Sequence, residues 1–451
     1  MATKQSTNGL PSLRHLTLDQ AAAGLQSGSF TSVDLVKAYL ARIDEVNQDL
    51  KAVLQPPHGI PILVKDNVAT SDKSLHASAG SYTLMGAKPR SESSVIRKLR
   101  DAGALILGKT NLSEWTNFRG LDISSGWSPR GGQALGIYRP GTSPGGSSSG
   151  SAVAAALGLS TLALGTEVGE RPLSPIQSGA FTSPRRQDVI GTLTRTVKDA
   201  AYVLSIIAGH SGQDERTHKI PSDQIQDYTT FCNDTDLNGV TIGIPRNTFT
   251  ADAADPVMEA FEAALETLKH AGAKIVDNAD FPAAEEFTKS FPAEEYPHRD
   301  IGKFLWTQAE VIDVDSDKYR DMAKQEIYSG GEGGILGVME THGVDVLAVP
   351  SSFGIGNDLA AKMGFPVIGV PLGFYPPGTK EQVDSGWPNL VKVSEGLPFS
   401  LTFITKSFPD GVLLKVAYAF EQLTDVRHGG PTPFKLPTTE LTDVQGKAEK
   451  I

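Results

Sequence analysis

The sequence is poor in the residues that disulfide-bonded, metal-binding and nucleic-acid-binding proteins need. Its one cysteine, Cys232, cannot form a disulfide within the chain, which fits a reducing compartment. The nine histidines are dispersed without metal-ligand spacing, so we expect no metal site. With 41 Lys and Arg against 52 Asp and Glu, the formal charge is −11, which argues against a nucleic-acid partner.

Long apolar segments are missing as well. No stretch approaches the roughly 20 apolar residues that cross a bilayer, and residues 1–16 lack the apolar region of a secretory signal. We therefore expect a cytoplasmic protein without a membrane partner. At 451 residues and 39% hydrophobic, the chain is nevertheless able to bury a large core.

The sequence does contain an alternation of helical and strand patterns. Thr31 or Ser32 precedes a helix whose apolar residues recur at three- and four-residue steps up to Val46. Further helices are predicted at 93–102, 152–159, 255–271 and 410–423, and buried strands at 60–64, 104–108, 240–244, 344–349 and 365–370. This alternation predicts an α/β fold with a mixed central sheet covered by helices.

We expect one large domain over residues 16–428. Residues 1–15 predict a flexible N-terminal tail, and residues 429–451 a polar, poorly anchored C-terminal tail. The stretch 122–150, rich in Ser, Gly and Pro, is too long for an ordinary connection. Connections of that length in compact domains are usually functional.

Lys65 is the first candidate for chemistry because it directly follows the apolar strand 60–64. A lysine at the C-terminal end of a buried strand loses hydration, which lowers its pKa and lets it act as a neutral base. The simpler alternative is a charge that emerges at the rim of a sheet. Position at a strand end does not decide between the two.

The second candidate is the loop 143–151, with the sequence SPGGSSSGS. Its residues permit unusual backbone geometry and supply hydroxyls and unpaired N–H groups, although the same composition suits a flexible linker. Residues 141–145 and 146–150 both fit the G-x-S-x-G nucleophile motif, which requires a buried strand directly before it. The preceding segment 134–140 is a poor strand, so we do not favour that motif.

Four segments together are far more specific than either candidate alone. They are GIPILVKDN at 59–67, KLRDAGALILGKTNLSEW at 98–115, SPGGSSSGSAVAAALGLSTLALGTE at 143–167 and GFPVIGVPLGF at 364–374. In order and spacing they resemble the amidase signature family, closest to fungal and bacterial general amidases. The resemblance implies an α/β/α fold around a mixed sheet, and hydrolysis of the carbon–nitrogen bond of a small carboxamide without metal or organic cofactor.

The resemblance also implies a Ser-Ser-Lys triad. In the family, a neutral lysine withdraws a proton through a bridging serine, which is held by a cis peptide bond and activates a nucleophilic serine. Lys65 matches the base, Ser147 the bridging serine and Ser148 its supporting neighbour. Val168 and Gly169 match the region whose N–H groups stabilise the oxyanion.

The family pattern breaks where the nucleophile belongs. The family motif ends in Gly-Gly-Ser, whereas this chain has Gly169, Glu170 and Arg171. A guanidinium that stays protonated cannot attack a carbonyl, and a carboxylate at 170 would repel the developing oxyanion. Ser174 is the candidate replacement nucleophile. The sequence therefore leaves two functions open, that of an amidase-type hydrolase and that of a catalytically impaired relative that lacks the nucleophile.

Two segments are shorter than the family pattern, before residue 58 and between residues 166 and 190. They are either real divergence or sequence lost from the gene model. Trp115, Trp127 and Arg130 precede the serine loop and are predicted to border the entrance of the site, while aromatic residues in 291–330 are candidates for lining a substrate pocket. The sequence does not indicate an oligomeric state.

Overall fold

A computed structural model gives the structure of the protein. It describes residues 10–55, 61–72, 75–118, 124–168, 188–214, 226–249, 255–283, 330–350, 363–384, 388–408 and 410–445, with a few isolated residues between these ranges. Within these ranges, no helix combines the length and the apolar character that crossing a bilayer requires.

The N-terminal half is built on a five-stranded mixed sheet. Its strands are β1 (Val53–Gln55), β2 (Pro61–Lys65), β3 (Leu105–Thr110), β6 (Leu162–Val168) and β7 (Asp188–Leu193), in the order β1-β3-β2-β6-β7. The central strand β2 runs parallel to both β3 and β6, and the edge strands β1 and β7 are antiparallel to their neighbours. A sheet buried on both faces explains why the predicted strands are continuous apolar runs.

Helices cover both faces of this sheet, because successive strand residues point to opposite sides. Leu63 packs in one core with α2 (Ser32–Leu50) and α4 (Ser149–Leu157). Ile62 and Val64 pack in another core with α3 (Ser94–Asp101) and α5 (Val197–Ile207). This is the three-layer α/β/α arrangement that the resemblance implied.

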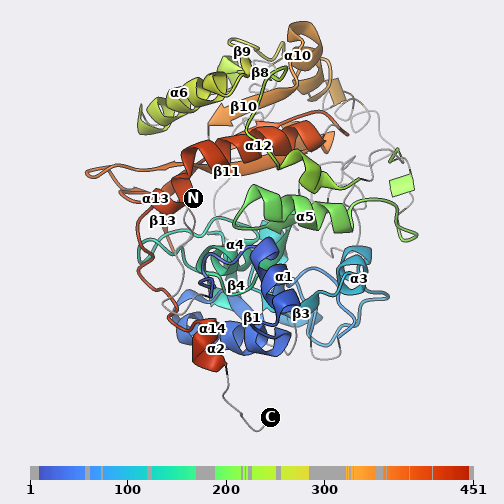
Figure 1. The fold of residues 1–451 in the computed structure, drawn as a ribbon, viewed down its shortest axis with the longest axis vertical. Helices are drawn as coiled ribbons and strands as arrows, with labels where there is room; N and C mark the ends of the chain where they lie inside the picture. Colours follow the sequence, from blue (N-terminus) through green and yellow to red (C-terminus); the bar gives the residue numbers. More distant parts are fainter. Residues whose placement is uncertain are drawn as a thin grey trace.

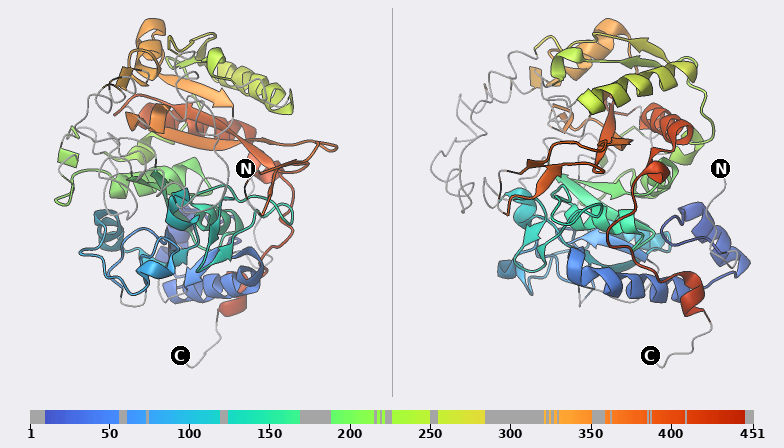
Figure 2. Two further views of the ribbon diagram at one scale, coloured as in Figure 1. Left: turned by 180° about the vertical axis from the view of Figure 1, so that it is seen from behind. Right: turned by 90° about the vertical axis from the view of Figure 1, so that its left-hand side faces the viewer.

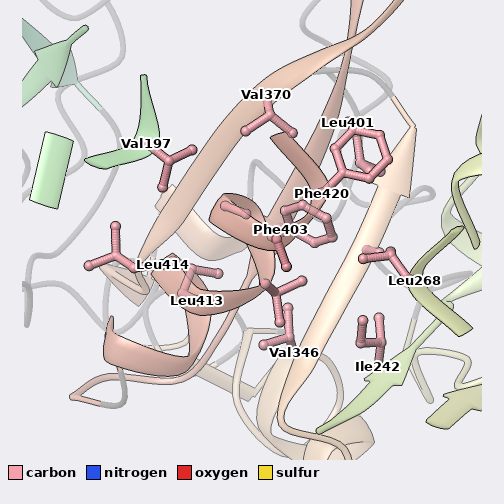
Figure 3. Close-up of a cluster of buried hydrophobic side chains, with 14 of the residues drawn as sticks. Val197, Ile242, Leu268, Val346, Val370, Leu401, Phe403, Leu413, Leu414 and Phe420 are labelled. Atoms are coloured by element: carbon pink, nitrogen blue, oxygen red, sulfur yellow. The ribbon is translucent and has the colours of Figure 1, made fainter. Parts of the chain in front are cut away.

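The C-terminal half repeats the layering. Its sheet contains β8 (Thr241–Gly243), β9 (Lys274–Val276), β10 (Val346–Pro350), β11 (Val367–Phe374) and β14 (Pro398–Ile404), in the order β11-β14-β10-β8-β9. One face packs on α6 (Asp255–His270) and α12 (Asp410–Thr424), in the core shown in Figure 3, where Phe403 and Phe420 meet. The other face packs on α10 (Ile335–His342).

The predicted α/β fold with a mixed sheet covered by helices is confirmed, and the described strands form two five-stranded sheets and two two-stranded ones. Helix α5 joins the two halves, because Val203 and Ile207 pack in the core of the first sheet while Val197 and Ala201 pack with α12. Figures 1 and 2 show α5 (green) beside α12 (red) where the two halves meet.

The remaining described elements are short. They are α1 (Leu18–Ser27), α13 (Val426–Gly429), α14 (Leu441–Val444), the 3-10 helices η1 (Tyr82–Leu84), η2 (Glu114–Asn117), η5 (Tyr228–Phe231) and η6 (Arg246–Thr248), and the hairpin strands β4 (Trp127–Ser128), β5 (Gly132–Gln133), β12 (Gln382–Val383) and β13 (Val391–Val393). Helix α2 begins as predicted, with Thr31 as N-cap in a capping box with Asp34. Helix α4 begins three residues earlier than predicted, because Ser148 is its N-cap.

The described parts of both predicted tails pack on the domain, which differs from the poor anchoring that their polarity suggested. Glu440 accepts hydrogen bonds from Ser12 Oγ (2.8 Å) and from the N–H of Leu13 (2.7 Å). Leu441 is 1% exposed, in the core that contains α2. Arg42, fully buried on α2, donates to the carbonyl of Thr439 (2.7 Å). A buried apolar residue and hydrogen-bonded polar groups therefore anchor these segments together.

Candidate active site

Three segments of the N-terminal half meet at Lys65. The residue ends β2, between β3 and β6, and its side chain is fully buried. Its Nζ lies 2.7 Å from Oγ of Ser147, in the loop before α4, and 2.8 Å from Oγ1 of Thr166 on β6. A third, longer contact of 3.4 Å joins Nζ to the carbonyl oxygen of Thr166. The structure thus brings together two predicted site residues, Lys65 and Ser147, and adds a third group.

The backbone around Ser147 is closely held. The Gly146–Ser147 peptide bond is cis, and the carbonyl of Ser147 accepts a hydrogen bond from the N–H of Ser113 (3.1 Å). A Cβ at position 146 would lie 2.7 Å from Cβ of Ser125 and 2.9 Å from Oγ of Ser113. Position 146 therefore requires glycine, because a side chain there would displace the loop that presents Ser147.

Thr166 is fixed from two sides. Asn67 Nδ2 donates to Thr166 Oγ1 (3.0 Å). Ser148 Oγ accepts from the N–H of Thr166 and donates to its carbonyl, both at 3.1 Å. The sequence did not single out Thr166 or Asn67, although both lie in the quoted segments, Thr166 within β6 and Asn67 two residues after the end of β2.

Helix α4 sits close to the strands beneath the loop because its first residues are small. The N–H of Gly150 donates to the carbonyl of Asn111 (2.9 Å), and a Cβ there would lie 2.3 Å from the carbonyl oxygen of Ala52. Ser151 Oγ donates to the carbonyl of Leu164 (2.8 Å) on β6. The glycine and serines of the loop are thus a packed support for the site and not a flexible linker.

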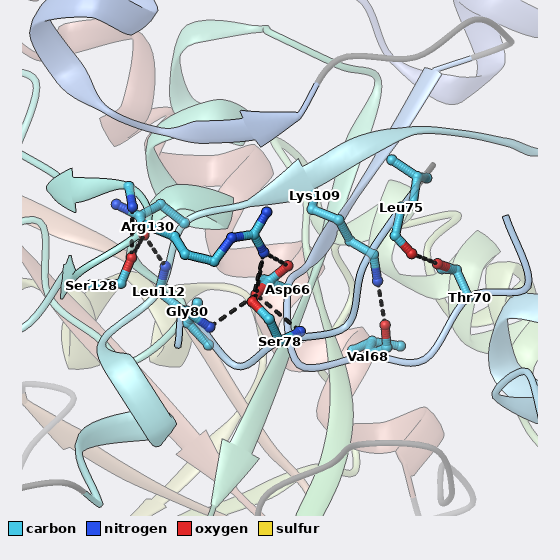
Figure 4. A network of polar contacts seen from close by, with 12 residues as sticks. Asp66, Val68, Thr70, Leu75, Ser78, Gly80, Lys109, Leu112, Ser128 and Arg130 are labelled. Atoms are coloured by element: carbon cyan, nitrogen blue, oxygen red, sulfur yellow. Dashed lines mark hydrogen bonds and ion pairs between the residues drawn. The ribbon is translucent and has the colours of Figure 1, made fainter. Parts of the chain in front are cut away.

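Asp66 begins a second buried network, shown in Figure 4. Its carboxylate accepts from Ser78 Oγ (2.6 Å), from the N–H of Gly80 (2.9 Å) and from Arg130 Nη1 (3.2 Å). The Arg130 side chain is 8% exposed and Asp66 is fully buried. Arg130, which the sequence assigned to the entrance, therefore pairs with a carboxylate inside the fold.

A second fully buried lysine, Lys109, lies on β3 beside β2. Its ammonium donates to the carbonyl of Val68. Burial lowers the pKa of Lys109 to about 8. The sequence did not single out this residue, although it directly follows the predicted strand 104–108 just as Lys65 follows the predicted strand 60–64.

Several predicted residues lie outside the part of the chain that the structure describes. They are Gly169, Glu170, Arg171 and Ser174. Of the predicted aromatic segment 291–330, residues 291–320 also lie outside it. Val168, the last residue of β6, pairs with Asp188 on β7, so the strand that leads to the predicted nucleophile position is in place.

Comparison with known proteins gives consistent matches along the chain. The family model described as Amidase matches residues 27–170 and 173–327. A putative amidase of Arthroderma benhamiae is 35% identical, with 93% of this chain and 87% of that protein covered. The native peptide amidase of Stenotrophomonas maltophilia has a similar structure, with a TM-score of 0.74, 28% identity, and 94% of this chain and 99% of that chain covered.

Two details of these matches concern the broken motif. The match to the family model is interrupted at residues 171 and 172, where the predicted nucleophile would lie. The alignment with the Arthroderma protein spans 520 residues, more than the 451 of this chain, so it includes stretches of that protein without a counterpart here.

Proposed function

This chain belongs to the amidase family, and from that premise we propose that it hydrolyses the carbon–nitrogen bond of a small carboxamide, with Lys65 as the base. The observation that supports the proposal is the buried contact of 2.7 Å between Lys65 Nζ and Ser147 Oγ. In the Ser-Ser-Lys scheme this contact transfers the first proton. A cytoplasmic location is part of the same proposal, supported by the single cysteine.

The surroundings of Lys65 suit a base. Its side chain is removed from water, which favours the uncharged amine. Thr166 and Asn67 hold the amine at a fixed distance from the serine hydroxyl. A positioned base of this kind typically contributes 10²–10⁴-fold to a reaction rate.

A second candidate function is that of an impaired relative, which keeps the fold and binds a carboxamide without turning it over. Arg171 supports it, because the resemblance puts that residue in the place of the nucleophilic serine. The interruption of the family match at the same place agrees with it.

The test is hydrolysis of simple and aryl amides by the purified full chain, compared with Lys65→Ala and with Lys109→Met as the matched buried-lysine control. We expect turnover that Lys65→Ala reduces at least 100-fold and Lys109→Met largely retains. Thermal unfolding of each variant separates loss of the base from loss of the fold. Equal rates for the wild type and Lys65→Ala would exclude the proposed mechanism.

Sequencing the transcript across residues 54–58 and 166–190 tests whether the broken motif belongs to the protein. Recovery of Gly-Ser in place of Glu170 and Arg171 would restore the family's own nucleophile. A transcript that matches the present sequence would show that the protein lacks the family's serine at position 171, so that any hydrolysis must use another nucleophile.

A further inference from the structure

We propose that Ser147 is itself the nucleophile of this chain, with Lys65 acting on it directly as a Ser–Lys pair. The inference rests on the proposed function, because it names the attacking atom of the same centre. It differs from the Ser-Ser-Lys scheme, in which Ser147 only passes a proton to a second serine.

The contacts of Lys65 orient its amine toward Ser147. A neutral amine has two N–H bonds and one lone pair. The hydroxyl and the carbonyl oxygen of Thr166, at 2.8 and 3.4 Å from Nζ, can accept the two N–H bonds. The lone pair then faces Ser147 Oγ at 2.7 Å, which is the geometry that proton removal from this hydroxyl requires.

Ser147 is also the residue of this cluster that a substrate can reach. Lys65 is fully buried and Thr166 is 7% exposed, whereas Ser147 is half-buried and Gly146, just before it, is exposed. The hydroxyl of the neighbouring Ser148 is occupied by both backbone groups of Thr166. A carbonyl carbon approaching from solvent therefore meets the Ser147 oxygen, with the base behind it.

Donors for an oxyanion lie directly after Ser147. Ser148 is the N-cap of the nine-residue helix α4, and the N–H groups of a first helical turn have no acceptor within the helix. No described residue accepts a hydrogen bond from the N–H of Ser148 or Ser149, whereas that of Gly150 is bound to Asn111. In serine hydrolases with a nucleophile elbow, the N–H that follows the nucleophile serves as an oxyanion donor in the same way.

The reaction balances without a further residue or a cofactor. The neutral Lys65 amine takes the proton of Ser147 Oγ as this oxygen bonds to the amide carbon. The Lys65 ammonium then gives that proton to the departing nitrogen, the carbon–nitrogen bond breaks, and an acyl ester remains on Ser147. Water attacks the ester with Lys65 again as base, which releases the carboxylic acid and restores Ser147.

A fluorophosphonate probe, which modifies activated serines covalently, tests this assignment on the full chain. We expect one adduct per chain, mapped by peptide mass spectrometry to Ser147. Lys65→Met should slow labelling at least 100-fold, because the probe then meets a hydroxyl without a base. Ser174→Ala, the control for the rival serine, should label as the wild type does.

A second variant tests the same assignment with a reactive side chain kept at position 147. In Ser147→Cys the thiol occupies the same place, and we expect iodoacetamide to alkylate it faster when Lys65 is present than in the double variant with Lys65→Met. Thermal unfolding of both variants shows whether the comparison is made on folded protein. Equal alkylation rates in two folded variants would contradict direct activation by Lys65.

The outcomes separate this inference from the proposed function. An adduct on Ser174 or on another serine, together with amide hydrolysis, would overturn the role of Ser147 and leave the proposed function standing. Neither an adduct nor hydrolysis would overturn both. An adduct on Ser147 with Lys65-dependent hydrolysis supports both.

Discussion

Lys65 and Asp66 are adjacent at the end of β2, yet they enter two buried networks with different properties. The Lys65 network consists of hydroxyl and amide groups and ends at Ser147, which is half-buried. The Asp66 network pairs a carboxylate with Arg130 and two N–H donors, and its members at 66, 78 and 80 are buried. The first network is the one that we propose meets a substrate, whereas the second is enclosed within the fold.

The two buried lysines differ in the same way, because their hydrogen-bond partners are of different kinds. Lys65 and Lys109 lie on neighbouring parallel strands and are equally buried. Lys65 contacts the hydroxyl of the half-buried Ser147, whereas Lys109 donates to the carbonyl of Val68, which has no proton to give. Burial raises the fraction of a lysine that is neutral, but the neutral amine becomes a base for catalysis only where its partner is a group that can lose a proton.

The largest effect on stability is expected for Asp66→Asn. The substitution leaves the Arg130 guanidinium buried without a counter-charge, which typically costs about 3–5 kcal/mol. Urea denaturation measures the free energy of unfolding. Adding Arg130→Met should recover part of the loss, because it removes the unpaired charge. A loss below about 1 kcal/mol would show that water reaches this network and screens it.

A smaller effect is expected for the pH dependence of Lys109. Its pKa is about 8 in the folded protein against an ordinary 10.5, so between these values the unfolded chain holds a proton that the folded protein has released. Stability relative to Lys109→Met should therefore rise with pH across this window, by on the order of 3 kcal/mol in total. Below pH 8 the buried charge destabilises the folded protein by this amount. Parallel pH curves for the two proteins would contradict the assignment.

The smallest effects are expected for two serine hydroxyls, one in each network. Ser78→Ala removes a hydrogen bond to the Asp66 carboxylate, and bonds to charged groups contribute about 1.5–3 kcal/mol. Ser148→Ala removes bonds to neutral backbone groups of Thr166, which contribute about 0.5–1.5 kcal/mol each. Urea denaturation of both variants should rank Ser78→Ala as at least equally destabilising. The reverse order would show that the neutral network contributes more to stability.

Local sequence predicted most of the elements around the site because their signals are local. Helix α2 begins at its predicted capping box, and β2 and β3 agree with their apolar runs to within a few residues. The start of α4 was missed because Ser148 and the small residues after it suit a loop and a helix equally well.

The candidate site was predictable in part. Lys65 and Ser147 were identified from motifs, and the sequence pattern supplied the same strand-end signal for Lys109. The resemblance implied the contact between Lys65 and Ser147, but Thr166 and Val68 as partners of the two lysines could not be predicted, because these contacts join residues far apart in the chain. Arg130 pairs with Asp66 across 64 positions, and its sequence context gave no indication of this.

The sequence by itself determined the family, the α/β alternation and the residue types at the centre, since these depend on motif order and local periodicity. It also led to the prediction that Arg171 stands where the family has a serine. Only the tertiary structure decided that Lys65 also faces Thr166, 101 positions away in the chain, while Lys109 faces a carbonyl. The physical reason is that a buried amine acquires its chemistry from the groups that packing places beside it, and parallel strands and α4 bring those groups from distant parts of the chain.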